Sequence, residues 1–224
     1  MEEISNTSSH ILFFDGATRV GNSIHEQIRK TFPGLNVTVV ALTDNENHLS
    51  YTHENLVVVG YSLGARRALD WATKKTFKGS VYLLDPECWK PSRVYGWATQ
   101  NQLGKIIFLF VVKVPLFLNL FTWLLPKRMR KQVQLFVQNK AFRNQLYQDW
   151  LAAAQFQVKP IESLGLSEDQ LTVVTSGDAI FLKYIPIENI KQQGIKILTL
   201  EERSHSQLWK HFFKDQFNPN ANSL

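Results

Sequence analysis

Short apolar runs alternate with amphipathic segments along most of the chain. Ile24, Ile28 and Phe32 recur at four-residue intervals, which places them on one face of a helix. Continuous apolar runs between such segments are typical of strands buried on both faces of a parallel sheet. Strands are predicted at 10–15, 36–42, 56–59, 80–84, 171–175 and 195–200, and helices at 21–32, 65–75, 180–192 and 206–213. We therefore predict an α/β fold with a mainly parallel six-stranded sheet and helices on both faces.

Residues 86–160 interrupt this alternation. Their middle, 106–125, is long and apolar enough for a membrane span, but Lys113 lies near its centre and Pro115 follows it. We expect this run to be divided in two rather than to cross a membrane. Further apolar residues recur at helical spacing between 129 and 150. The pattern predicts a helical cap, 86–160, inserted into a core formed by 1–85 and 161–224.

The distribution of charge follows the same division. Residues 86–160 hold 11 Lys and Arg against 2 Asp and Glu, a net charge of +9, whereas the rest holds 14 against 17, a net charge of −3. Such a localised excess favours one face that meets an anionic partner, and it does not indicate binding of nucleic acid. The alternative is a solvated pair of basic helices that binds nothing.

Composition limits the remaining classes. A chain of 224 residues with 44% hydrophobic content can bury a core of its own. Cys88 is the one cysteine, so there is no disulfide framework, and no Cys/His set has zinc-site spacing. The polar, acidic start of the sequence lacks the order of a secretory signal. We expect a cytoplasmic protein, either free or peripheral to a membrane, with no metal and no cofactor.

Gly-Tyr-Ser-Leu-Gly, residues 60–64, stands between a predicted strand and a predicted helix. A sharp turn there projects the side chain of Ser62 out of the sheet and aims the first helical N–H groups at it. Residues two before and two after the serine must be small, and Gly60 and Gly64 meet that demand. Since a serine hydroxyl is a weak nucleophile, a base and donors for an oxyanion are also needed.

The base and its acid are expected after later strands, because the carboxyl ends of parallel strands share one edge of a sheet. His205 follows the last strand, whereas the other five histidines precede a strand or lie in a helix or a polar loop. Asp178 follows the strand at 171–175 and is the preferred acid, although Ser-Gly-Asp also makes a good turn. Asp85, at the end of its own strand, is the alternative acid.

An oxyanion hole would take one N–H from Leu63, the residue after the serine. The second would come from the turn after the first strand, Gly16-Ala17.

These motifs resemble the α/β-hydrolase superfamily, with GYSLG as nucleophile elbow, SGDAI after the penultimate strand and SHS after the last. The resemblance implies a Ser62, Asp178, His205 triad and a cap inserted after the strand that ends at Asp85. Two departures stand out. The first two antiparallel strands of the family are missing, and Asp15-Gly16 replaces its His-Gly, which puts a carboxylate where negative charge is unfavourable.

The resulting prediction is a serine hydrolase that cleaves a carboxylic ester or thioester of an apolar acyl group through an acyl-Ser62 intermediate. Apolar cap residues would line a tunnel for the acyl chain, and the basic cap would meet an acidic acyl carrier protein. One alternative is a lipase-like enzyme that docks on an anionic membrane surface through the cap. Another is a lyase or a binding protein that uses the same three residues without hydrolysis.

Overall fold

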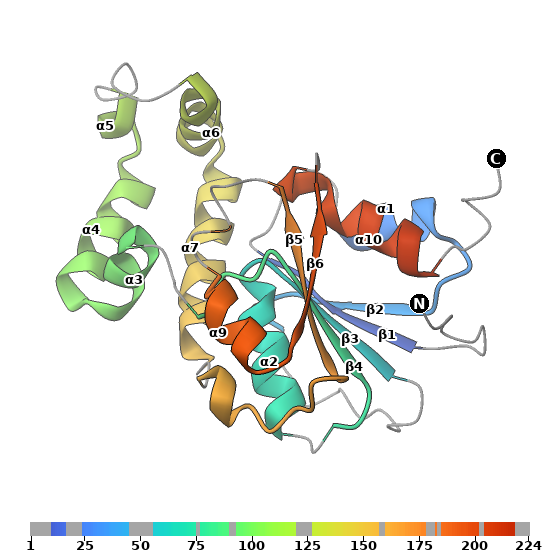
Figure 1. Cartoon of the computed structure of the whole chain (residues 1–224). Helices are drawn as coiled ribbons and strands as arrows, with labels where there is room; N and C mark the ends of the chain where they lie inside the picture. The colour runs from blue at the N-terminus through green and yellow to red at the C-terminus, as the bar shows by residue number, and fades with distance from the viewer. Residues whose placement is uncertain are drawn as a thin grey trace.

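The computed structural model describes residues 10–16, 24–44, 56–74, 77–89, 93–119, 127–156, 160–177, 182, 185–201 and 204–217. Its sheet has six strands in the order β2-β1-β3-β4-β5-β6, and every pairing is parallel. Figure 1 shows this twisted sheet at the centre of the core. The strands are β1 (His10–Phe14), β2 (Val37–Val40), β3 (Leu56–Tyr61), β4 (Ser80–Leu84), β5 (Leu171–Ser176) and β6 (Lys196–Leu200).

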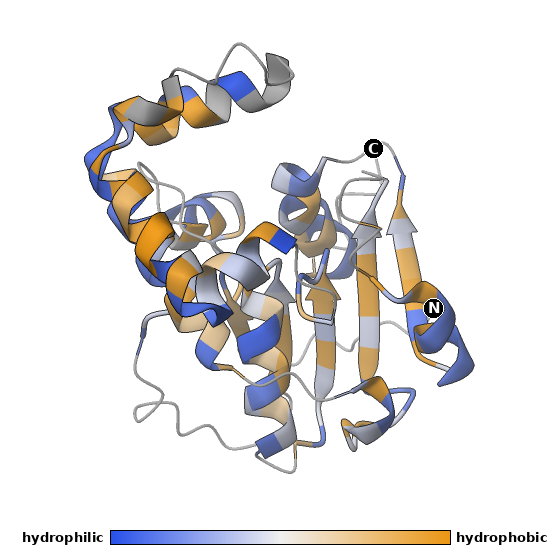
Figure 2. Cartoon of the chain, turned by 90° about the vertical axis from the view of Figure 1, so that its left-hand side faces the viewer, coloured by the Kyte–Doolittle hydropathy of each residue, from blue (hydrophilic) through white to orange (hydrophobic). Residues whose placement is uncertain are grey.

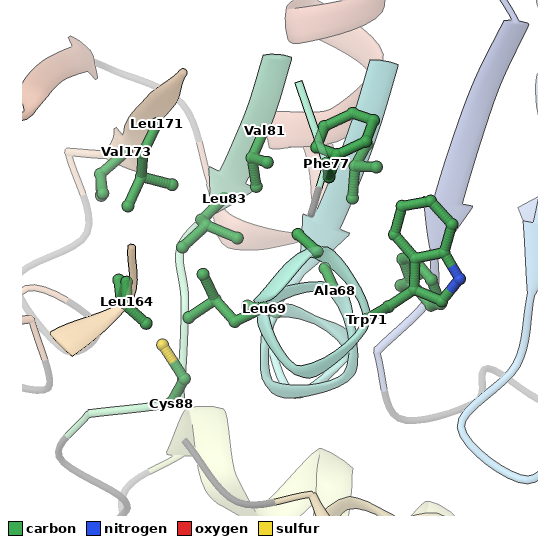
Figure 3. Close-up of a cluster of buried hydrophobic side chains, with 14 of the residues drawn as sticks. Ala68, Leu69, Trp71, Phe77, Val81, Leu83, Cys88, Leu164, Leu171 and Val173 are labelled. Atoms are coloured by element: carbon green, nitrogen blue, oxygen red, sulfur yellow. The ribbon is translucent and has the colours of Figure 1, made fainter. Parts of the chain in front are cut away.

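Two apolar clusters cover the two faces of the sheet, because alternate residues of each strand point to opposite sides. One cluster packs the sheet against α1 (Ile24–Thr31) and α10 (Leu208–Phe217). The other packs it against α2 (Gly64–Lys74) and α9 (Ile187–Gln192). In Figure 3, Leu69 and Ala68 of α2 point toward Val81, Leu83 and their neighbours on β4 and β5. The predicted fold class is thus confirmed.

Differences from the predicted elements are small and have local causes. The strand at 56–59 continues to Tyr61, so it reaches the residue before the serine. Of the helix predicted at 180–192, residues 187–192 form α9, which begins directly after Pro186, and residues 185 and 186 are not helical. Residues 178–181, 183 and 184 lie outside the described residues. A proline before the first helical residue suits a helix start, since it has no N–H to leave unpaired.

In the described part of the chain, five α-helices lie between β4 and β5, and we refer to them as the cap. They are α3 (Arg93–Gln100), α4 (Gln102–Lys113), α5 (Leu116–Asn119), α6 (Lys127–Gln138) and α7 (Lys140–Gln155). Helix α4 ends at Lys113, just before Pro115, so the apolar run is divided as predicted. Helix α7 contacts α2 of the core as well as α3, α4 and α6 of the cap (Figure 1). Among the described residues, no helix has the length and hydropathy of a membrane span.

Candidate active site

Ser62 stands at the turn between β3 and α2 with a left-handed backbone. Its φ is 53°, a strained value for a residue with a side chain, and its N–H donates to the carbonyl of Leu84, 2.9 Å away. A Cβ on Gly60 would lie 2.7 Å from both Ala65 Cα and Ala68 Cβ, and one on Gly64 would collide with the carbonyl oxygens of β1 and its following turn. The two glycines therefore let the helix pack close enough to hold the serine in this conformation.

His205 begins a short 3₁₀ helix (His205–Gln207) that follows β6. Its Nδ1 lies 2.9 Å from Oδ2 of Asp85, whose side chain is fully buried. The other carboxylate oxygen, Oδ1, accepts the backbone N–H of Ser176 at 2.7 Å. The carboxylate is thus held on both oxygens, and it fixes the imidazole through Nδ1.

Asp85 is the alternative acid of the sequence prediction, and it is the carboxylate that contacts His205. The preferred acid, Asp178, lies outside the described residues. Leu84 pairs with Val174 in the register of β4 and β5, so Asp85 and the end of β5 reach the same edge of the sheet. The N–H of Asp85 donates to the carbonyl of Val174 at 2.8 Å, and its φ of 42° turns the chain at this point.

Tyr61 holds His205 from a second side, a role that the sequence prediction did not include. Its ring stacks on the imidazole with centroids 5.0 Å apart and planes inclined by 23°. Its hydroxyl donates to the backbone carbonyl of His205 at 2.7 Å. An aromatic residue directly before the serine is the one sequence signal that could have indicated this contact.

Gly16 and Leu63 lie next to Ser62, as an oxyanion hole between two turns requires. A Cβ on Gly16 would lie 3.0 Å from Ser62 Cβ and 3.0 Å from the carbonyl oxygen of Tyr61, so a side chain there would crowd the serine. Leu63 is buried at the start of α2. Ala17, the other predicted residue of the hole, lies outside the described residues.

Arg66 and Glu87 connect this turn with the cap. The N–H of Glu87 donates to the carbonyl of Ser62 at 3.2 Å, and burial raises the pKa of the Glu87 carboxyl to about 7, although the nearby Arg66 opposes the shift. The Arg66 guanidinium is buried, lies 5.5 Å from the ring centroid of Tyr95 on α3, and donates to the carbonyl of Phe156 at 3.4 Å. Within the described part of the chain, its Nε and Nη1 have no hydrogen-bond partner.

Cys88 lies close to this region but is a poor second candidate for a nucleophile. The thiol is buried, and burial raises its pKa far above the ordinary value. Because the thiolate is the reactive form, this cysteine acts as a small apolar side chain of the core, as Figure 3 shows.

Comparison with known proteins gives a match in structure but not in sequence. No family model and no curated protein sequence matches the chain. The solved structure of a carboxylesterase of Nitrososphaera gargenis is similar to this chain, with a TM-score of 0.53 and 12% identity. The match covers 99% of this chain and 97% of the carboxylesterase. MGS-M2, an α/β-hydrolase enzyme from a deep-sea metagenome, is also similar, with a TM-score of 0.52 and 17% identity. This match covers 96% of this chain and 89% of MGS-M2.

The chain has the α/β-hydrolase fold. BioG of Haemophilus influenzae also matches, at a TM-score of 0.50 and 15% identity, over 93% of this chain and 96% of that one. Identities this low show the fold and leave the substrate open. In this α/β-hydrolase fold, Ser62 follows β3, Asp85 follows β4 and His205 follows β6.

Proposed function

We propose that the protein is a serine hydrolase that cleaves a carboxylic ester or thioester of an apolar acyl group. The observation that carries the proposal is the buried Asp85 carboxylate bound to Nδ1 of His205, at the same end of the sheet as the strained Ser62. A carboxylate in this position stabilises the imidazolium that forms when the histidine takes a proton. A simple structural role for His205 would not require a fully buried acid behind it.

In the proposed reaction, His205 takes the proton of the Ser62 hydroxyl while the serine oxygen attacks the carbonyl carbon. The imidazolium then gives that proton to the leaving alkoxide or thiolate, and an acyl-Ser62 ester forms. Water, deprotonated by His205, attacks this ester. The bond between the acyl carbon and the Ser62 oxygen then breaks, the imidazolium returns its proton to that oxygen, and the carboxylic acid leaves. The N–H of Leu63, with a donor from the turn at 16–17, would stabilise the oxyanion in both steps.

An apolar acyl group is proposed because the surroundings of Leu63 are apolar. Leu63 packs with Leu42, Tyr95 of α3 and Ala153 of α7 in a buried cluster at the junction of core and cap. Trp150 and Phe156 lie against the same cluster. An acyl chain that leaves Ser62 along this junction would meet mainly carbon, with the Arg66 guanidinium beside the Tyr95 ring as a charged neighbour.

An acidic acyl carrier protein is the proposed source of that acyl group. The net charge of +9 on residues 86–160 supports this choice, since opposite charge speeds the encounter of two proteins and weakens with salt. Turnover of a carrier-bound acyl thioester should then exceed that of the soluble thioester of equal length and should fall with ionic strength. Equal rates without salt dependence would remove the carrier protein and leave the hydrolase.

Hydrolysis itself is tested with p-nitrophenyl esters and acyl thioesters of rising chain length. We expect turnover by the wild type and none above background for Ser62→Ala. The exposed Ser163, replaced by alanine, provides a matched control that should keep wild-type activity. Equal turnover by Ser62→Ala would overturn the proposal, and binding of product without turnover by the wild type would favour the non-hydrolytic alternative.

A further inference from the structure

The outer face of α3 and α4 exposes a stripe of large apolar side chains, which we call the outer cap face. On α4, these residues recur at three- and four-residue intervals, so they lie along one side of the helix. Figure 2 shows apolar residues on the cap helices that face the viewer. The members of the outer cap face, each at least 40% exposed, are Val94, Trp97, Leu103, Ile106, Ile107, Phe110 and Val114.

The cap already has an interior, and the outer cap face is not part of it. On the inner side of α4, the ring of Phe108 packs on Tyr147 and Trp150 with centroids 5.4 and 4.9 Å apart. Gly104 is buried against the backbone of Trp97, and Val112 is buried as well. The predicted acyl tunnel therefore does not include Ile106 or Phe110, whose side chains are 65% and 54% exposed.

A buried arginine on α7 connects the C-terminal ends of α4 and α6 by hydrogen bonds. Arg143 on α7 donates from Nε to the carbonyl of Val112 at 3.0 Å, and from Nη1 to the carbonyls of Phe136 and Val137 at 2.9 and 2.6 Å. These carbonyls lie at the C-terminal ends of α4 and α6, where a positive charge is favourable. The outer cap face is thus held outward by the packing of the cap.

The charge around the outer cap face is positive. Arg93, Lys105 and Lys113 are exposed on α3 and α4. Residues 86–160 contain two carboxylates, Glu87 and Asp149. Glu87 lies at the Ser62 turn, and Asp149 is fully buried beside the Gln145 amide, 2.9 Å away. Neither carboxylate opposes an anionic partner at the outer cap face.

We propose that the outer cap face docks on the surface of an anionic lipid bilayer. Helices that lie in the plane of a membrane interface have leucine, isoleucine and aromatic residues on one side and lysine beside them. Exposed apolar patches of this kind mark interaction sites. The net charge of −3 on the rest of the chain favours an orientation with the cap toward the lipid and the core away from it.

Two other occupants fit less well. In a symmetric dimer through this face, two caps of charge +9 would meet each other, and like charges across an interface are unfavourable. An acidic protein, the proposed carrier protein included, would meet the basic residues but would cover the aliphatic stripe on α4 only if it had an apolar patch of its own. A bilayer supplies both an anionic surface and an apolar layer beneath it.

The test measures co-flotation of the full chain with vesicles of phosphatidylcholine mixed with phosphatidylglycerol, and with vesicles of phosphatidylcholine alone. We expect binding to the anionic vesicles at low salt. The double variant Ile106→Ser/Phe110→Ser should weaken it by about tenfold or more, because apolar area no longer enters the interface. Each of these side chains is exposed, so the change should leave the unfolding midpoint and the esterase activity near those of the wild type.

A charge-reversal pair separates docking from general attraction. Lys113→Glu, three residues after Phe110 on the same side of α4, should weaken vesicle binding by about tenfold, since each basic residue near an anionic surface contributes on the order of 1 kcal/mol. Lys191→Glu, the same change at an exposed site on α9 of the core, should have little effect. Brominated lipid should quench part of the tryptophan fluorescence of the wild type when it binds. The quenched fraction should be smaller in Trp97→Phe.

Three results would overturn docking on lipid. The first is no binding to anionic vesicles at low salt. This result includes the case in which the outer cap face joins two copies of the chain, which would be detected as a dimer that the double serine variant dissociates. The second is equal binding of the double serine variant and the wild type. The third is equal loss of binding in Lys113→Glu and Lys191→Glu. None of these depends on Ser62, so the proposed hydrolase activity would stand unchanged.

Discussion

The core and the cap place their apolar side chains in different ways. In the core, the apolar residues of β1, β3, β4 and β5 are almost fully buried between helices on the two faces of the sheet. In the cap, α4 has apolar residues on both sides, and those of its outer side face solvent. The charges differ too, at −3 for the core and +9 for residues 86–160. The core therefore buries its apolar side chains within itself, whereas the cap leaves several of its own exposed to solvent, where the proposed docking on lipid would cover them.

The residues proposed for catalysis and the surface proposed for docking therefore lie in different parts of the molecule. Ser62, Asp85 and His205 all follow strands of the core, and Tyr61, which holds His205, belongs to β3. Arg66 provides a link to the cap, since it reaches Tyr95 of α3 and the carbonyl of Phe156 after α7. Changes in the core should therefore act on the chemical step, and changes on the cap surface on what is bound.

The largest expected effect is at the acid of the core. Asp85→Asn should lower kcat by about 10³- to 10⁴-fold, because an amide does not stabilise the imidazolium of His205. Asp178→Asn provides the comparison and should stay within about threefold of wild type. The side-chain carbonyl of the introduced asparagine can still accept the N–H of Ser176, so the unfolding midpoint should change little. A large loss in Asp178→Asn with a small one in Asp85→Asn would reverse the assignment.

A second effect concerns the tight packing of the elbow. Gly60→Ala should lower the free energy of unfolding by about 3 kcal/mol, since its Cβ would meet the backbone Cα of Ala65, which cannot move aside cheaply. Gly34→Ala is the matched control, because a Cβ there meets nothing within 4 Å. Chemical denaturation measures both variants. Similar stabilities of the two would contradict the close approach of β3 and α2.

The cap should be loosened without unfolding the core by Arg143→Met. The change removes three hydrogen bonds to buried carbonyls of α4 and α6 and should cost the cap about 2 kcal/mol. Amide hydrogen exchange should increase in the cap helices, while β3 and β4 keep their protection. Lys140→Met, an exposed position on the same helix, should change neither. Equal loss of protection in sheet and cap would mean that the two parts unfold as one unit.

The smallest effect is on the pH dependence of stability. The Glu87 pKa of about 7 lies above its ordinary value of 4.5, so the folded chain keeps a proton that the unfolded chain releases between these pH values. Its contribution to stability is therefore lost as the pH rises through this interval and is constant above it. Glu87→Gln does not ionise and should flatten this slope, by on the order of 1 kcal/mol between about pH 5 and pH 7.

Thermal unfolding of Glu87→Gln as a function of pH provides this measurement. The exposed Glu188 of α9, replaced by glutamine, serves as the control. An unchanged slope in Glu87→Gln would show that the carboxyl is not protonated near neutral pH.

Much of the core could be predicted from sequence because its signals are local. Continuous apolar runs alternating with helical segments indicated all six strands, and the glycines around Ser62 indicated the turn. The carboxylate that contacts His205 could not be chosen in this way. Asp85 and Asp178 both follow strands, β4 and β5 are neighbours, and the direction of each side chain depends on backbone angles such as the φ of 42° at Asp85. The order of the strands in the sheet likewise depends on packing between distant segments.

The cap shows a different limit of sequence interpretation. Hydropathy identified 106–125 as apolar, but it did not distinguish Phe108, which packs inward on Trp150, from Phe110, which is 54% exposed. Both residues lie on one helix, and the positions of α3 and α7 decide which side is covered. The outward direction of the stripe on α4 is therefore a property of the tertiary structure.

The most direct measurement of the central claim is covalent labelling of the wild type with a fluorophosphonate, followed by intact-mass and peptide analysis. The Ser62–His205–Asp85 arrangement predicts one adduct per chain on Ser62, formed at least about a hundredfold more slowly in Asp85→Asn. No adduct should form in Ser62→Ala. Labelling on another residue, or wild-type labelling rates in Asp85→Asn, would contradict the proposed active site.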